Sequence, residues 1–225
     1  MVPLQDTIAQ SNGGQSFSIQ EAKRIVADLF TPDPLIYWGD FIATTTVAYG
    51  FAVLYLTAPT GSWEQLACFV IAGLALFRNG VFIHEIVHMP RGRMTAFKVA
   101  WNVLYGGPML TPSFMYKNHS DHHNWRHYGT PRDGEYLPMG APGSFRKILG
   151  YLLQIPLLPA FAILRFLVLG PVSLLIPPLR RWVLERASSY VCNPGYRREL
   201  PVNERRGTWV AMELLCFTTV ATVFG

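Results

Sequence analysis

The 225-residue chain has few charged residues and few cysteines, and both shortages restrict what it can be. Charged residues make up 15% of the chain and hydrophobic residues make up 50%, whereas a soluble domain is typically about 25% charged. This composition excludes a disordered chain, a collagen and a coiled coil. Its three cysteines (Cys68, Cys192 and Cys216) are odd in number and far apart, which excludes a disulfide framework and a thiolate zinc site.

Two long apolar runs near the N-terminus predict a membrane hairpin. Residues 35–57 are almost wholly apolar and long enough to cross a bilayer, which requires about 20 residues. Residues 66–77 form a second run, and the turn between the two, residues 58–62, is uncharged. We therefore expect an all-α integral membrane protein with one or more transmembrane helical hairpins, interfacial helices and a cytosolic, histidine-rich cap.

The first 34 residues are predicted to form a separate polar segment, followed by the membrane domain over residues 35–225. The segment lacks an apolar run after a basic start, so we expect no cleavable signal peptide. Ser18 and Glu21 are spaced as a capping box, followed by apolar residues at helical spacing up to Phe30. This amphipathic helix would pack on its own protein or, alternatively, lie on the bilayer surface.

Prolines and glycines interrupt the later apolar segments. Residues 96–115 contain Gly-Gly-Pro and Thr-Pro breaks, which predict a bent segment in the membrane interface. Residues 148–179 carry several prolines and Arg165. A straight crossing would place this arginine in hydrocarbon at a cost of about 2.5–3.5 kcal/mol or more, so two short interfacial helices are predicted instead. A further span should begin near Thr208.

The net charge of +5 comes from basic residues that flank apolar segments. Sixteen of the nineteen lysines and arginines lie between Arg91 and Arg206. Several form adjacent pairs: Arg146-Lys147, Arg180-Arg181, Arg197-Arg198 and Arg205-Arg206. This placement favours contact with lipid headgroups over nucleic-acid binding, and the positive-inside rule places the basic part of this multi-pass protein in the cytosol.

Histidine clustering is the strongest functional signal. All six histidines fall in one short window: His84, His88, His119, His122, His123 and His127. Residues three or four apart share a helix face, so the HEIVH run at 84–88 and the HSDHH run at 119–123 can each present neighbouring imidazoles to a metal. Five such rings exceed what one tetrahedral zinc uses. They indicate two metals, or one metal surrounded by further histidines.

Together, the two histidine runs and the membrane hairpin resemble the integral-membrane fatty acid desaturase and hydroxylase superfamily. The run from His119 to Tyr136 is similar to the second histidine box and following loop of bacterial members. The resemblance implies oxygen-dependent desaturation or hydroxylation of a fatty acyl or related lipid chain at a histidine-bound di-iron centre. Electrons would come from a ferredoxin-type or cytochrome b5-type protein, which the cytosolic basic residues Arg126 and Arg132 could dock.

Carried over by position, the resemblance makes five histidines the iron ligands: His84, His88, His119, His122 and His123. His127 lies outside both boxes and would at most contact a ligand, and no chemistry is assigned to Asp133 or Glu135. The family has a third box, but no histidine follows His127. We therefore expect the sequence to be a fragment that is cut before that box, within the apolar run at its end.

Two other functions remain open from the residues themselves. His84-Glu85-Ile-Val-His88 also matches the HExxH signature of zinc metallopeptidases, with Glu85 as general base. That interpretation leaves three histidines without a role, since one further ligand suffices. A non-enzymatic polytopic membrane protein is the third possibility.

Overall fold

The protein is described by a computed structural model over residues 18–27, 31–136, 144–193, 195–200 and 206–224, and these residues form helices and connecting loops. They divide into two units, one up to Gly39 and the other from Asp40 onward. In the first unit, helix α1 (Ile19–Ile25) begins after Ser18, whose hydroxyl accepts a hydrogen bond from the Glu21 amide at 3.3 Å. The predicted cap is therefore present. The helix was expected to continue to the Thr31-Pro32-Asp33-Pro34 stop, but it ends earlier, at Ile25, with Val26 as its C-cap.

The predicted hairpin is confirmed. Helices α2 (Pro34–Thr57) and α3 (Trp63–His88) are both long and apolar enough to cross a membrane. Asp40 and Arg78 form an ion pair between the two helices. In the next turn of α2, the hydroxyls of Thr44 and Thr45 lie 3.2 and 3.3 Å from Oδ1 of Asn79, the residue after Arg78 on α3. These polar contacts fix the register of the two helices in a setting where hydrophobic burial does not favour association.

The segment after the hairpin bends as predicted. Helix α4 (Thr95–Trp101) continues into a π-turn, η2 (Asn102–Gly106), and helical structure then ends. Phe97 joins Phe41 and Phe82 in edge-to-face contacts with ring centroids 5.4–6.0 Å apart. Trp101 donates its indole N–H to the Asn79 carbonyl at 2.8 Å. These contacts attach α4 to the membrane hairpin, and a position in the interface remains a prediction.

The prediction of two short helices within residues 148–179 was wrong. Phe145–Leu175 is one helical run of 31 residues, long and apolar enough to span a membrane. It comprises α6 (Ser144–Gln154), the 3₁₀ turn η4 (Ile155–Leu157), α7 (Leu158–Leu164), the π-turn η5 (Arg165–Leu169) and α8 (Gly170–Leu175). The prolines lie in the first turns of η4, α7 and α8, where a missing backbone N–H is tolerated.

Arg165 does not break this run because protein groups contact its Nε and Nη2, although its buried Nη1 has no hydrogen-bond partner among the described residues. Its side chain is 1% exposed and contacts the Ala187 carbonyl and the Ser188 hydroxyl, both at 2.8 Å. It also pairs with Glu213 on helix α10 (Gly207–Phe224), a residue that Arg180 contacts as well. The predicted cost assumed an arginine surrounded by lipid, whereas this guanidinium is enclosed by its own chain. Helix α10 is apolar and begins where a further span was predicted, near Thr208, but its described part is shorter than the candidate spans, so that span remains a prediction.

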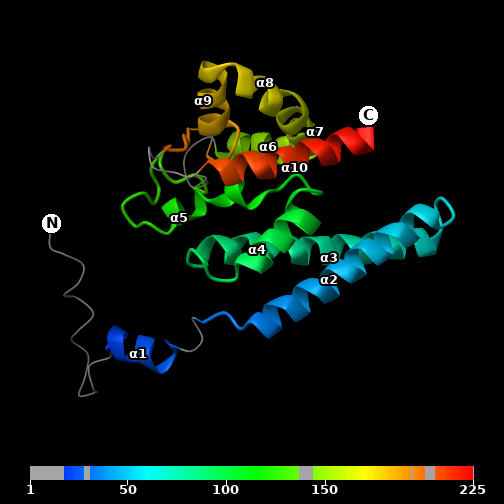
Figure 1. Cartoon of the computed structure of the whole chain (residues 1–225), viewed down its shortest axis with the longest axis horizontal. Coiled ribbons are helices and arrows are strands. Elements are labelled where there is room, and N and C mark those ends of the chain that lie inside the picture. Colours follow the sequence, from blue (N-terminus) through cyan, green and yellow to red (C-terminus); the bar gives the residue numbers. More distant parts are fainter. Residues whose placement is uncertain (1–17, 28–30, 137–143, 194, 201–205, 225) are drawn as a thin grey trace. The chain divides into compact units, whose positions relative to one another are not determined.

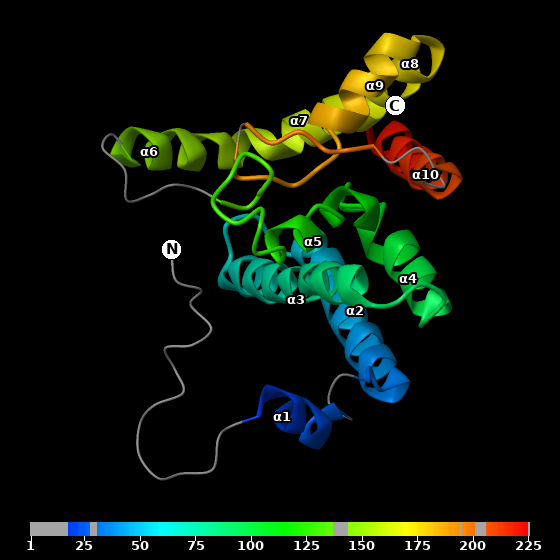
Figure 2. The ribbon, with the colours of Figure 1, turned by 90° about the vertical axis from the view of Figure 1, so that its left-hand side faces the viewer.

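Within the second unit, α5 (His119–His122) lies between two groups of helices. Helices α2, α3 and α4 lie on one side of it, and α6–α8, α9 (Pro177–Arg186) and α10 lie on the other (Figures 1 and 2). A hydrophobic core connects α10 to the segment before α5. It comprises Phe114, Met115, Phe166, Leu184, Trp209 and Cys216. This core and the hairpin therefore hold α5 from opposite sides.

Candidate metal centre

Four histidines from two helices converge on one point. His84 and His88 occupy the last turn of α3, and His119 and His123 lie at the start and just after the end of α5. One ring nitrogen from each residue lies within 4.8 Å of the others. Both pairs have the i, i+4 spacing that places side chains on one helix face. The rings of each pair lie together, as their spacing predicted, and the fold brings the two pairs together. Their role as metal ligands remains a prediction.

Ring separations show how closely the two helices approach. The His84 and His119 ring centroids are 4.6 Å apart, and those of His88 and His123 are 4.8 Å apart. His119 Nε2 and His123 Nε2 are separated by 2.9 Å. Nitrogen atoms grouped this closely are candidate ligands of a metal ion.

Local sequence explains why α3 ends where it presents its histidines. Met89 leaves the helical conformation with φ −68° and ψ 129°, as expected for a residue that precedes proline. Pro90 therefore stops the helix immediately after His88. The ε-ammonium of Lys98 contacts the carbonyls of Met89 and Pro90 at 3.1 and 3.0 Å. These contacts hold the chain at the exit of the helix.

Glu135 fixes the ring of His119. His119 Nδ1 lies 2.7 Å from Glu135 Oε1, and because a carboxylate only accepts, Nδ1 must donate and Nε2 keeps its lone pair. Burial lowers the pKa of His119, although Glu135 acts in the opposite direction. Neutral imidazole is the form that binds metal. The ring is therefore held ready to coordinate through Nε2.

Tyr116 completes this arrangement. Its ring stacks on His119 with centroids 4.8 Å apart and planes at 13°, and its hydroxyl donates to Glu135 Oε2 at 3.4 Å. Burial, together with the charge of Glu135, raises the pKa of Tyr116 to about 12. The phenol therefore remains a hydrogen-bond donor at physiological pH.

His122 lies beside the four-histidine cluster and faces a different carboxylate. Its Nδ1 is 3.0 Å from Asp133 Oδ1, and its ring centroid is 5.8 Å from that of His123. Asp133 is fully buried and also accepts from the Gly129 and Glu135 amides at 3.4 and 3.0 Å. Because Nδ1 of His122 donates to Asp133, the lone pair of this ring lies on Nε2. Its predicted role as a ligand remains a prediction.

His127 is separate from this arrangement. Its Nδ1 lies 3.8 Å from Asp121 Oδ1, a residue to which Tyr196 also donates, at 3.1 Å. The structure therefore places His127 against the α5 carboxylate and outside the four-residue cluster.

Asp133 and Glu135, to which no chemistry was assigned from the sequence, each contact a histidine. Carboxylates commonly orient metal-binding imidazoles, and the two acidic residues of this loop, 11 and 16 positions after the histidines they contact, were a signal for that role. Spacing alone could not identify them, because the intervening loop has to fold back. Close packing at Gly134 positions this loop. A β-carbon added at Gly134 would lie 2.8 Å from Val191 Cγ1 and 3.2 Å from Asn118 Nδ2.

Known proteins resemble this chain over most of its length. Residues 61–225 match the sequence model of a family described as "Fatty acid desaturase". The chain is also 35% identical over 199 residues to a protein named "Ceramide hydroxylase" from Caulobacter vibrioides (strain NA1000 / CB15N). That alignment covers 88% of this chain and 56% of the relative, so the chain spans little more than half the length of that protein. No solved structure matches the chain.

Proposed function

Because this chain belongs to the fatty acid desaturase family, we propose that it is a membrane oxidoreductase that hydroxylates an acyl chain of a ceramide-like lipid. Convergence of four histidines at the end of an apolar hairpin carries the proposal. The name of the relative favours hydroxylation and a sphingolipid, whereas the family description also accommodates desaturation.

The cluster suits iron, and we propose a di-iron centre. The ligands would be His84, His88, His119, His122 and His123. Four of these already converge, and Asp133 leaves the other nitrogen of His122 available for a second ion. Iron bound there would supply the redox chemistry that breaking an unactivated C–H bond requires and that acid–base side chains cannot provide.

Each contact of the surrounding residues has a defined effect on the ligands. Glu135 and Asp133 fix the tautomers of His119 and His122, so that both present Nε2. The negative charge of each carboxylate makes the imidazole that donates to it a more basic ligand. Tyr116 covers one face of His119 and limits its rotation. The protein's own contribution is therefore to hold neutral, oriented nitrogens beside the apolar hairpin.

Hydroxylation with dioxygen consumes two electrons and two protons and releases one water, so the reaction needs an electron donor. We propose a ferredoxin-type or cytochrome b5-type protein that docks on the cytosolic side. The exposed Trp125 and Arg126, whose guanidinium lies 5.4 Å from the Trp125 ring centroid, are close to the histidine loop in sequence and offer a basic contact. The positive-inside rule supports this orientation.

The test is lipid analysis of cells that express the full-length gene. A hydroxylase adds one oxygen atom to a ceramide species, whereas a desaturase removes two hydrogen atoms, and mass spectrometry separates the two. His119→Ala should abolish the product and reduce bound iron. Product formation that is unchanged in both His119→Ala and His84→Ala would contradict the proposal.

Metal and peptidase assays on the purified full-length protein test the metallopeptidase alternative. Glu85 Oε1 lies 3.3 Å from His84 Nδ1 and the side chain is exposed. Glu85→Gln should only weaken an oxygenase, whereas it would abolish a peptidase that used Glu85 as its base. Zinc near one ion per chain, together with peptidase activity lost in Glu85→Gln, would replace the oxygenase proposal.

A further inference from the structure

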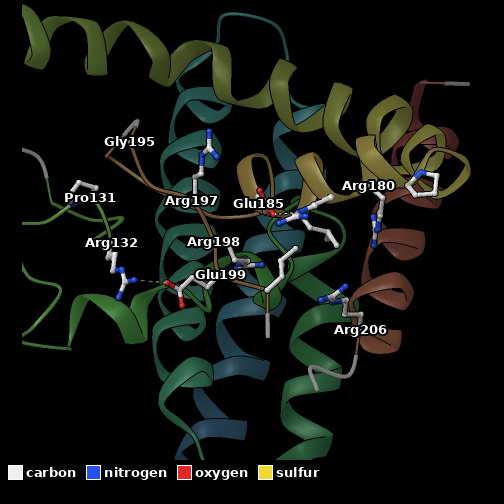
Figure 3. A pocket seen from close by; sticks show the side chains of 13 residues that line it. Pro131, Arg132, Arg180, Glu185, Gly195, Arg197, Arg198, Glu199 and Arg206 are labelled. Carbon is white, nitrogen blue, oxygen red and sulfur yellow. Dashed lines mark hydrogen bonds and ion pairs between the residues drawn. The ribbon is translucent and has the colours of Figure 1, made fainter. Parts of the chain in front are cut away.

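Arginine pairs that lie far apart in the sequence line one cavity of about 770 Å³. The cavity lies beside α9 and the segment 195–200 (Figure 3). Six arginines and two glutamates line it: Arg132, Arg180, Arg181, Arg197, Arg198, Arg206, Glu185 and Glu199. None of the residues that line it belongs to the histidine cluster.

The two glutamates of the cavity neutralise only some of its six arginines. Glu199 lies 3.4 Å from Arg132, and Glu185 lies 2.7 Å from Arg181. Arg180 has to share Glu213 with the buried Arg165, which leaves one positive charge uncompensated in that group. Figure 3 shows Arg132 and Glu199 joined as an ion pair and Arg198 near the centre of the view. The lining therefore carries an excess of positive charge.

Arg198 indicates what the charge could bind. The residue is 5% exposed, and its Nη2 donates to the Phe114 carbonyl at 2.6 Å. Its buried Nη1 has no hydrogen-bond partner within the described part of the chain. Burial lowers the pKa of Arg198 to about 10, so the guanidinium remains charged at neutral pH. A buried, charged donor without a partner is costly, and an anion in the cavity would remove that cost.

The location of the cavity favours a lipid over a soluble anion. Pro177 lines it and begins α9, directly after the candidate span Phe145–Leu175. Arg206 lines it and immediately precedes the apolar helix α10. Leu184 and Leu200 contribute apolar surface. A phospholipid headgroup lies at the depth where apolar helices emerge from a bilayer, and its acyl chains would follow those helices.

We propose that this cavity binds the phosphate group of an anionic membrane phospholipid. Guanidinium forks match phosphate oxygens in pairs, and a concave site suits a small headgroup. An acidic electron-donor protein presents its carboxylates on an outer surface, and such groups do not readily reach a guanidinium as buried as that of Arg198. The bound lipid is a site-specific ligand, distinct from the lipid that is oxidised.

The experiment measures how lipids raise the Tm of the purified full-length protein in detergent. Dioctanoyl phosphatidic acid is the probe, and dioctanoyl phosphatidylcholine and inorganic phosphate are compared with it. The test variants are Arg198→Gln and Arg197→Gln. Arg197 is exposed, so the second variant keeps its fold if the first does not. Arg93→Gln removes an exposed arginine that does not line the cavity and serves as the matched control.

We expect phosphatidic acid to bind more tightly than the other two probes. Its Kd should rise about tenfold in Arg197→Gln, which corresponds to the loss of one charge-assisted contact of about 1.4 kcal/mol, and should not change in Arg93→Gln. Equal Kd values in the wild type and Arg197→Gln would overturn the proposal. It would also fall if inorganic phosphate bound as tightly as the lipid, or if Arg197→Gln weakened the binding of an acidic ferredoxin but not of the lipid.

Discussion

His119 Nδ1 and Glu135 Oε1 lie 2.7 Å apart, and this contact determines which nitrogen of the ring faces the histidine cluster. Glu135 follows His119 by sixteen residues and returns to it through a loop that Asp133 organises. The carboxylate would thus act on the candidate metal site through the imidazole that it orients.

Removing the charge of Glu135 should weaken metal binding. Glu135→Gln retains the size of the side chain but loses the carboxylate that makes His119 a more basic ligand. We expect iron affinity to fall about 10–100-fold, as is common when such partners are changed, and metal analysis after dialysis against graded chelator would measure it. Glu199→Gln alters an exposed glutamate away from the cluster and is the control. Equal iron retention in both variants would contradict the role given to Glu135.

The loop that carries these carboxylates should not tolerate a side chain at Gly134. In Gly134→Ala the new β-carbon would lie 2.8 Å from Val191 Cγ1, and overpacking of this kind typically costs about 1–3 kcal/mol. We expect Tm to fall, together with iron content. Adding Val191→Ala should recover part of both losses because it removes the closest atom.

Gly150→Ala is the matched control for that substitution. Gly150 lies within α6, and a β-carbon added there would meet no other side chain of the described residues within 4 Å. Alanine should therefore leave Tm unchanged or raise it through its better helix propensity. If the Gly134 and Gly150 variants unfolded at the same temperature, close packing would not explain the glycine in the loop.

The buried ion pair between Arg165 and Glu213 should contribute far more to stability than an exposed pair. Glu213→Met leaves the buried Arg165 guanidinium without its carboxylate partner, and breaking a buried pair on one side costs about 3–5 kcal/mol. Arg181→Met breaks the exposed pair with Glu185, which should cost about 1 kcal/mol or less. Thermal unfolding in detergent would compare the two variants, and similar losses would show that Arg165 is not held as described.

Alkaline pH should destabilise the protein partly through Tyr190. Its hydroxyl donates to the Leu110 carbonyl at 3.0 Å, and burial raises its pKa above the ordinary value of 10. The folded state therefore favours the neutral phenol. The stability that this neutral phenol contributes is complete below pH 10 and is lost as the pH rises above that value. Tyr190→Phe should flatten the fall of Tm above pH 10, and an unchanged slope would exclude Tyr190 as a cause.

The predictable parts of this molecule are those that depend on neighbouring residues. The apolar lengths of α2 and α3 identify the hairpin, and the i, i+4 spacing of His84 with His88 places both rings on one face. Arg165 could not be interpreted in this way. Its partner Glu213 is 48 residues away, so sequence spacing gave only the cost of the arginine and not its compensation.

The same limit applies to the loop carboxylates and to the arginine cavity. Asp133 meets His122 only because the loop folds back, and Gly134 permits that close approach. Arg180, Arg198 and Arg206 appeared as separate basic sites flanking apolar segments, and the packing of α9 and the following segment brings them to one cavity. Contacts of this kind depend on tertiary structure that local patterns do not contain.

The order of synthesis gives the Arg165–Glu213 pair a consequence during biogenesis. When the ribosome has just produced the segment around Arg165, the carboxylate that will neutralise it has not been translated and is still 48 residues away. A bare guanidinium opposes release into lipid, so we expect this segment to reach its final position only after α10 has emerged and supplied Glu213.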